Sequence, residues 1–206
     1  MRQSARAVIG IDEVGRGPIA GPLTVGAFTA DPRILRKYFR GVKDSKQLSP
    51  AEREAWYTKI VACENTGAVR FSVSFVSVAV LDRIGMSKSL VRAVDASLRK
   101  IEADCRRDRV LLDGALRAPS RFIRQSTIIG GDESIPLIAL ASIVAKVLRD
   151  RKMVRLAKSF PLYRFEKHKG YGTREHYRAL EKFGLCDLHR RSFLGKFLAQ
   201  SEKRKV

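Results

Sequence analysis

The chain has 206 residues and a formal net charge of +20, because its 41 Lys or Arg outnumber its 21 Asp or Glu. A field of this sign attracts polyanions, so nucleic acid is the expected partner, with a merely solvated basic surface as the alternative. The 45% share of hydrophobic residues excludes an intrinsically disordered chain, and the lack of an apolar run of roughly 20 residues excludes a membrane-spanning helix.

The first predicted elements are two strands and a helix. Residues 7–12 form an apolar run rich in β-branched side chains, which favours a buried strand over a helix. A turn rich in Gly and Pro follows, and residues 23–30 predict a second strand. Ser49, Pro50 and Glu52 predict the start of a helix with a capping box.

The middle of the chain alternates strands with helices. Residues 69–78 alternate apolar with polar or basic side chains, which predicts a half-buried strand. Residues 86–106 predict a helix, whose apolar face carries Leu90, Val94, Leu98 and Ile101. Residues 109–114 predict an apolar strand that ends on an acid and a turn glycine.

The last part of the chain is predicted to be mainly helical. Residues 126–129 predict a short strand, and a long helix is expected from Asp132 past Met153. Two further helices are expected at residues 174–183 and 190–200. Strands that precede an alternation of strands and helices are typical of an α/β domain with a mixed sheet.

The sequence shows no internal repeat and no linker, so we expect residues 1–206 to form one domain. The three cysteines contain no C-x-x-C pair, which argues against a zinc site and against a disulfide framework. No charged and then apolar leader opens the sequence, and we therefore expect a cytoplasmic protein with reduced cysteines.

Three acids share one context at the ends of predicted strands. Asp12, Asp113 and Asp132 each follow an apolar strand, directly or across a Gly-Gly turn. Ligands bind beyond the carboxyl ends of strands in open α/β sheets, and carboxylates gathered there repel one another unless a cation neutralises them. Carboxylate oxygens select Mg²⁺ or Mn²⁺. For each acid alone, a simple turn or cap residue is the alternative.

Glu13 directly follows Asp12, and neighbouring strand residues point to opposite faces. We therefore expect the strand to end or bulge here, so that both side chains reach one pocket. Asp44, in a polar loop, and Asp150, between two arginines, are rival acids, and a surface ion pair is the expected role of Asp150. Two bound ions would activate water and stabilise the leaving 3′ oxygen.

Several residues outside the acids suit nucleic acid. The segment Gly15-Arg16-Gly17 offers backbone N–H groups and a guanidinium to a sugar-phosphate backbone, although a Gly-x-Gly turn is common. Lys46 offers an ammonium to phosphate, although an exposed lysine is usually only solvated. Tyr171, held between two glycines, is free to lie against a sugar and read a 2′-hydroxyl, with a buried loop tyrosine as the alternative.

Two other patterns predict no catalysis. The three histidines (His168, His176 and His189) lack the H-E-x-x-H spacing of a zinc enzyme. Ser142 and Lys146 lie one helical turn apart in the long predicted helix, and we interpret them as packing residues and not as a Ser–Lys dyad.

Residues 10–18, Gly-Ile-Asp-Glu-Val-Gly-Arg-Gly-Pro, closely resemble the signature of ribonuclease HII, the type 2 ribonucleases H. Further blocks resemble the same family in its own order, at residues 44–46, 112–114, 131–132, 141–147, 168–171 and 189–193. Lys43 departs from a frequent Asn and Leu140 from a usual Ala, and neither touches the acids.

The resemblance implies a fold and a set of site residues. The fold is a ribonuclease H-like mixed β-sheet flanked by helices, with a C-terminal helical region whose residues, about 160–206, form a substrate-binding extension. The implied catalytic and metal-binding residues are Asp12, Glu13, Asp113 and Asp132. The implied substrate-binding residues are Gly15, Arg16, Gly17, Lys46 and Tyr171.

The resemblance also implies an activity. The family hydrolyses the RNA strand of RNA–DNA hybrids and cuts 5′ of single ribonucleotides in duplex DNA, leaving 3′-hydroxyl and 5′-phosphate ends. It uses Mg²⁺ or Mn²⁺, with two ions in the reactive complex, and serves ribonucleotide and RNA-primer removal. We expect a monomer without a membrane partner. The rivals are a basic nucleic-acid-binding protein without catalysis and another two-metal nuclease, such as a junction resolvase.

Overall fold

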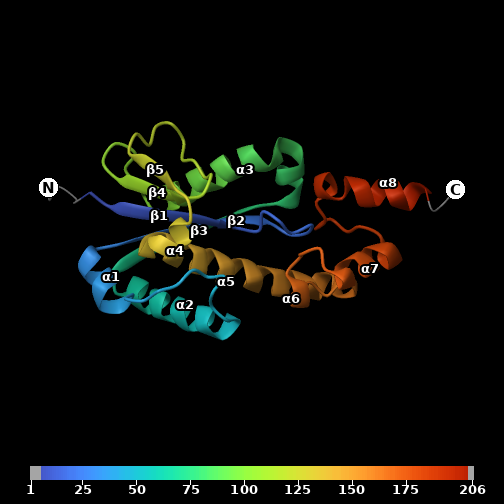
Figure 1. The fold of residues 1–206 in the computed structure, drawn as a ribbon, viewed down its shortest axis with the longest axis horizontal. Helices are drawn as coiled ribbons and strands as arrows, with labels where there is room; N and C mark the ends of the chain where they lie inside the picture. The colour runs from blue at the N-terminus through green and yellow to red at the C-terminus, as the bar shows by residue number, and fades with distance from the viewer. Residues whose placement is uncertain (1–5, 204–206) are drawn as a thin grey trace. The chain divides into compact units, whose positions relative to one another are not determined.

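The computed structural model describes the backbone of residues 6–203 and the side chains of residues 6–200. A five-stranded sheet runs in the order β3-β2-β1-β4-β5 (Figure 1). Its strands are β1 (Val8–Val14), β2 (Leu23–Ala30), β3 (Val69–Val76), β4 (Arg109–Asp113) and β5 (Gln125–Ile128). Strand β1 is antiparallel to β2 and parallel to β4, and β4 is parallel to β5, so the predicted mixed sheet is confirmed.

The helices partly follow the predicted pattern. They are α1 (Pro32–Tyr38), α2 (Pro50–Asn65), α3 (Val78–Lys100), α4 (Gly131–Ser134), α5 (Pro136–Ser159), α6 (Phe165–His168), α7 (Arg174–Phe183) and α8 (Gly195–Lys203). Two 3-10 turns, Pro161–Tyr163 and Arg191–Phe193, complete the set. The predicted capping box of α2 is confirmed, because the Ser49 side chain accepts from Glu52 N and the Glu52 side chain accepts from Ser49 N. No helix in the described part of the chain is both long and apolar enough to cross a membrane.

The structure corrects three predicted helices and adds one that was not predicted. Helix α3 begins earlier than expected, at Val78, and kinks at Gly85, whose φ is 79°. The long helix expected from Asp132 is broken into α4 and α5, because Ile135 is extended and Pro136 disfavours helical backbone in the residue before it. Helix α1 was not predicted, and the helix expected at residues 190–200 is a 3-10 turn followed by α8.

The chain forms two compact units. The first comprises the described residues up to Val14 with Thr24–Phe75 and Leu90–Leu148, and the second comprises Gly15–Leu23, Val76–Ser89 and the described residues from Arg149 on. The core of the first unit joins the sheet to α1, α2 and α5, and Leu140 is buried in it. The core of the second unit gathers Ile19, Ala20, Met153, Ala157, Tyr163, Phe165, Leu180 and Leu194.

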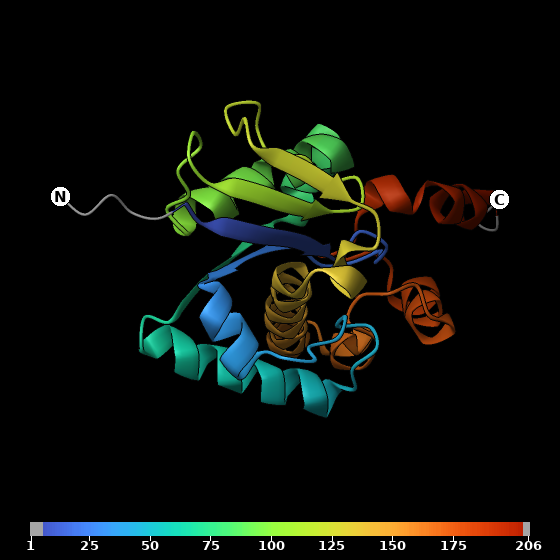
Figure 2. The same ribbon diagram turned by 60° about the vertical axis from the view of Figure 1, so that its left-hand side comes forward.

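Within the first unit, helix α5 lies against one face of the sheet (Figure 2). A Cβ on Gly10 of β1 would lie 2.3 Å from the Leu137 backbone, and a Cβ on Gly26 of β2 would lie 2.4 Å from Ala141 O. The two glycines therefore allow α5 to approach β1 and β2 at this point. Glycine has no side chain, so the choice of glycine at these two positions sets how near the helix can lie to the sheet.

Candidate functional site

Three of the predicted acids meet at one edge of the sheet. Strands β1 and β4 are parallel and pair up to Ile11 and Leu112, so the residues that follow, Asp12 and Asp113, lie side by side. One carboxylate oxygen from each of Asp12, Glu13 and Asp113 lies within 4.8 Å of the others. Asp12 is 3% exposed, and the other two acids are partly buried. This geometry is the meeting of carboxylates expected from parallel strand ends.

Glu13 joins Asp12 in a way that the sequence did not predict. We expected β1 to end or bulge at these residues, but β1 continues to Val14 in register with β2, which corrects that expectation. The recorded pairing of β1 with β4 stops at Ile11. At Asp12 and Glu13, β1 is therefore no longer paired with β4, although it is still paired with β2.

Asp132 is linked to the same acids through its backbone. The Asp113 Oδ1 atom accepts hydrogen bonds from Gly131 N at 2.8 Å and from Asp132 N at 3.3 Å. The Asp132 carboxylate, 6% exposed, instead accepts a hydrogen bond from Lys46 Nζ at 2.7 Å. Its carboxylate is not part of the 4.8 Å group, so the structure gathers three of the four predicted acids and ties the fourth to Lys46.

The electrostatics of the acids favour a divalent cation. The pKa of Asp12 is raised to about 8, mainly because burial desolvates its carboxylate; the charges of Glu13 and Asp113 contribute to this rise, and a hydrogen bond from Ser142 opposes it. A buried carboxylate among other carboxylates is neutralised either by a proton or by a cation. Oxygen donors at this spacing suit hard cations such as Mg²⁺ or Mn²⁺, so the donor set fits the predicted ions.

The loop at residues 44–46 is held by its own hydrogen bonds and contacts Asp132. Asp44 is buried, and its carboxylate accepts a hydrogen bond from Lys46 N at 3.2 Å, so this rival acid shapes the turn. Arg53 Nη1 donates to Ser45 O at 2.8 Å. Asp132 raises the pKa of Lys46 through their hydrogen bond, which favours a permanently charged ammonium here. The loop thus places the charged ammonium of Lys46 next to the Asp132 carboxylate.

Asp150, the other rival acid, lies 4.0 Å from Arg149 Nη1, so it has an ionic partner, but Arg149 is fully buried and the pair is not the predicted surface ion pair. Ser142, interpreted from the sequence as a packing residue, instead hydrogen-bonds Asp12, and that interpretation is wrong. The spacing between Ser142 and Lys146 could not predict this contact, because Asp12 lies on β1, far from Ser142 in the sequence.

In the second unit, the buried Arg190 holds Gly15 and Arg16, and the buried Arg149 lies against Gly15. Arg149 and Arg190 are both 0% exposed. Arg190 Nη2 donates to Gly15 O at 2.7 Å, and its Nη1 donates to Arg16 O at 3.1 Å. Gly15 has a φ of 95°, and a Cβ there would lie 2.4 Å from Arg149 Nε. Sequence reasoning did not find this role, although Arg190 lies within a block that carries the family resemblance.

Tyr171, also in the second unit, is 42% exposed. Its backbone is fixed, because Tyr171 N donates to His168 O at 2.9 Å and Tyr171 O accepts from Thr173 N at 2.8 Å. The Arg149 guanidinium lies 5.9 Å from the Tyr171 ring centroid, within the range of a cation–π contact. A ring that is partly exposed on a fixed backbone is suited to contact a ligand.

The three histidines gather beneath this loop. His176 Nδ1 lies 2.8 Å from Tyr171 O, His176 Nε2 lies 3.0 Å from His189 Nε2, and Cys186 N donates to His189 Nδ1 at 2.9 Å. A carbonyl only accepts, so His176 carries its proton on Nδ1 and His189 carries its proton on Nε2. Both rings are therefore neutral, and burial lowers the pKa of each to about 4.

Acid should weaken the fold through these histidines. Unfolded histidine has a pKa of 6.5, so between pH 6.5 and about 4 the unfolded chain binds more protons, and the stability present above pH 6.5 is lost as the pH falls. Asp12 acts oppositely, because its raised pKa lets the folded state keep a proton. We therefore expect Asp12→Asn in EDTA to lose on the order of 2 kcal/mol per histidine between pH 7 and pH 4.5.

Urea unfolding followed by circular dichroism measures this loss. Adding His189→Gln to the Asp12→Asn protein removes one of the two rings whose pKa is about 4, so the loss on acidification should shrink. An identical loss with and without His189 would contradict the neutral histidine pair.

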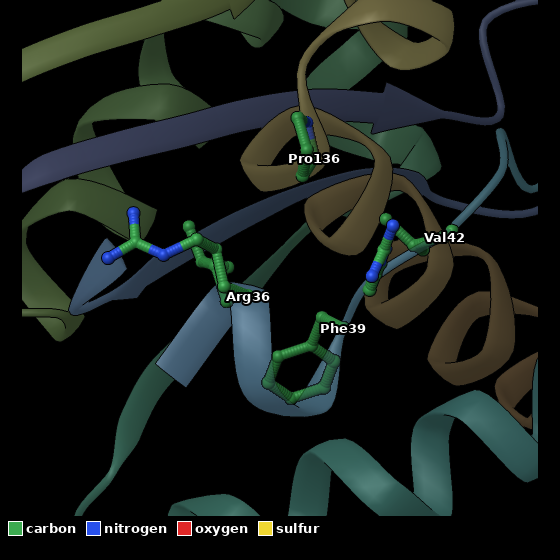
Figure 3. Close-up of a pocket in the computed structure, with 7 residues that line it drawn as sticks. Arg36, Phe39, Val42 and Pro136 are labelled. Carbon is green, nitrogen blue, oxygen red and sulfur yellow. The ribbon is translucent and has the colours of Figure 1, made fainter. Parts of the chain in front are cut away.

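The first unit also has a surface pocket. It is lined by Leu35, Arg36, Phe39, Arg40, Gly41, Val42 and Pro136. Figure 3 shows Phe39, Val42 and Pro136 around it, with the guanidinium of Arg36 pointing away from Phe39. None of its lining residues is a predicted site residue.

Comparisons with known proteins agree on one family. The sequence profile described as "Ribonuclease HII" matches residues 9–196. The ribonuclease HII of Caldicellulosiruptor bescii is 40% identical over 201 residues, which cover 97% of this chain and 92% of that protein. Ribonuclease HII proteins of Coxiella burnetii are 37% identical over 186 residues, covering 90% of this chain and 87% of theirs.

Solved structures have the same fold. The ribonuclease H2 from Pyrococcus horikoshii superposes with a TM-score of 0.76 at 25% identity, covering 96% of this chain and 99% of that one. Bst-RNase HIII in complex with Mn²⁺ superposes with a TM-score of 0.71 at 22% identity, covering 98% of this chain and 72% of that one. The expected ribonuclease H-like fold is thereby confirmed.

Proposed function

The chain belongs to the ribonuclease HII family of hydrolytic endonucleases, and we propose that it cuts the RNA strand of RNA–DNA hybrids and the 5′ side of single ribonucleotides in duplex DNA. The observation that carries this proposal is the grouping of three carboxylates within 4.8 Å at the end of two parallel strands. A noncatalytic nucleic-acid-binding protein has no use for mutually repelling buried acids, so the grouping favours catalysis.

We propose that Asp12, Glu13, Asp113 and Asp132 hold two Mg²⁺ or Mn²⁺ ions. Such ions, when bound, supply the charge that activates water and stabilises the leaving 3′ oxygen, which yields 3′-hydroxyl and 5′-phosphate ends. The chain's own part is geometric. Asp12 presents a desolvated carboxylate, and two backbone N–H groups hold one oxygen of Asp113.

Lys46 is proposed to contact a backbone phosphate of the substrate. Its side chain is 76% exposed although its ammonium touches Asp132, so the group is accessible to a ligand. A phosphate arriving here brings a negative charge to an ammonium that one carboxylate already holds in place. Lys46 thus serves both a metal-site acid and the substrate in this proposal.

The remaining substrate contacts are proposed for the second unit. Gly15, Arg16 and Gly17 are proposed to dock the substrate backbone near the ribonucleotide, and the hydrogen bonds from buried Arg190 to the carbonyls of Gly15 and Arg16 support this role. Tyr171 is proposed to sense the 2′-hydroxyl and the adjoining deoxyribose. Residues of about 160–206 form the substrate-binding extension in this proposal, and the biological role is the removal of ribonucleotides and RNA primers from DNA.

A labelled duplex with one embedded ribonucleotide tests this function. We expect a single cut 5′ of the ribonucleotide with Mg²⁺ or Mn²⁺ and none with EDTA, because the acids alone supply no counter-charge for the reaction. An all-DNA duplex of the same sequence is the control. No cutting in either metal would contradict the proposal, and equal cutting of the all-DNA duplex would favour the junction-resolvase alternative.

A further inference from the structure

Two buried serines adjoin the metal-site acid Asp12. Ser142 on α5 is 1% exposed and Ser45 in the 44–46 loop is 2% exposed, and their hydroxyl oxygens lie 2.7 Å apart. The Ser142 side chain also hydrogen-bonds the Asp12 carboxylate. A pair of buried hydroxyls therefore ends on a proposed metal ligand.

The sheet register independently brings Asp12 to this helix. Asp12 pairs directly with Gly26, and Gly10 lies two residues before it, so these three residues share one face of the sheet. That face is the one against which α5 packs, because a Cβ on Gly26 would lie 2.4 Å from Ala141 O. Ser142 follows Ala141 in the helix. The close approach allowed by Gly26 thus places a helix hydroxyl beside the acid.

The direction of each hydrogen bond follows from the number of protons. In its ionised form, the form that holds a cation, the Asp12 carboxylate only accepts, so the single hydroxyl proton of Ser142 points to Asp12. The Ser142 oxygen is then the acceptor for Ser45, whose hydroxyl donates to it. Ser45 is itself held, because Arg53 Nη1 donates to its carbonyl at 2.8 Å. The result is an ordered series from Ser45 through Ser142 to Asp12.

We propose that Ser142 is a positioning residue for Asp12, and that Ser45 orients the Ser142 hydroxyl, so that the ionised carboxylate is aimed at the divalent ions it would hold. The inference rests on the metal site of the proposed function. Partners that hydrogen-bond a metal-ligating carboxylate set its orientation, and losing one typically lowers metal affinity by about 10–100-fold.

The same loop contacts the site at a second point. Lys46, the neighbour of Ser45, holds the Asp132 carboxylate at 2.7 Å. One short loop therefore reaches Asp12 through two hydroxyls and Asp132 through an ammonium. The position of this loop therefore affects both Asp12 and Asp132. This explains why a buried serine, and not a smaller apolar residue, follows Asp44.

The test compares Mn²⁺ binding in the metal-free full-length protein, measured by calorimetric titration and by electron paramagnetic resonance of the unbound ion. We expect Ser142→Ala to raise the Kd about 10-fold and Ser45→Ala to raise it by a smaller factor, with Ser142→Thr, which keeps a hydroxyl, close to the wild type. Ser72→Ala is the matched control, because Ser72 is buried in the same unit and donates to Ser97 O at 2.7 Å.

A wild-type Kd in Ser142→Ala would overturn the positioning role, and so would an equal rise in Ser72→Ala, since that would reflect general loosening. If Ser142→Ala does not fold, Ser45→Ala decides in the same way. A wild-type protein that binds Mn²⁺ with the expected serine dependence but cuts no ribonucleotide-containing duplex would overturn the proposed function and leave the positioning role standing.

Discussion

Replacing Asp12 or Asp113 by Asn should lower the cleavage rate by on the order of 10³-fold or more while leaving duplex affinity nearly unchanged. The substitution keeps the shape of the side chain and removes the charge that attracts a divalent ion. Both residues belong to the group of oxygens within 4.8 Å, so each loss leaves the group short of one anionic ligand. Affinity should survive because a chain of net charge +20 binds the phosphate backbone mainly through its basic surface.

Single-turnover cleavage of a duplex with one ribonucleotide measures the rate, and fluorescence anisotropy in EDTA measures the affinity. Asp150→Asn is the matched control, because Asp150 is paired with Arg149 and lies outside the acidic group. Its rate should stay within a few-fold of the wild type. A parallel loss of affinity in Asp12→Asn, or an equal rate loss in Asp150→Asn, would contradict the assignment of the acids.

Lys46→Ala should produce the second largest effect, a fall in cleavage efficiency of roughly 10–100-fold, as expected for a lost charged contact of 1.5–3 kcal/mol. Two causes act together: the Asp132 carboxylate loses its partner at 2.7 Å, and the substrate phosphate loses an ammonium. Losing one phosphate contact should also reduce the slope of log affinity against log salt by about one unit.

Lys43→Ala is the matched control for this experiment. Lys43 is an exposed lysine three residues earlier in the chain. Its removal changes the net charge equally, so any general electrostatic effect should appear in both variants. If Lys43→Ala and Lys46→Ala behave alike, Lys46 has no specific role, and the contact with Asp132 is only a surface ion pair.

Strands such as β2 were predictable because a short, continuous apolar run with β-branched residues favours a buried strand over a helix. Residues 23–30 are buried almost throughout, as a central strand requires, and the predicted bounds agree with β2. The helix breaks were not predictable in the same way. The sequence from Ile135 to Leu148 is mostly apolar, and the backbone restriction before Pro136 divides α4 from α5.

The candidate site shows the same division. Parallel strands bring their carboxyl ends to one edge, so the meeting of Asp12 and Asp113 followed from two apolar runs that each end in an acid. The contact of Lys46 with Asp132 joins residues 86 positions apart and depends on how the loop packs. Ser142 was misinterpreted for a similar reason, because its partners lie on β1 and in the 44–46 loop and not on its own helix.

The central claim is that these carboxylates hold divalent ions, and a crystal soaked in Mn²⁺ tests it most directly. We predict anomalous density within coordination distance of the Asp12, Glu13 and Asp113 carboxylates, and its loss in crystals of Asp12→Asn. Manganese bound only elsewhere on the protein, with these three side chains turned away from one another, would contradict the account.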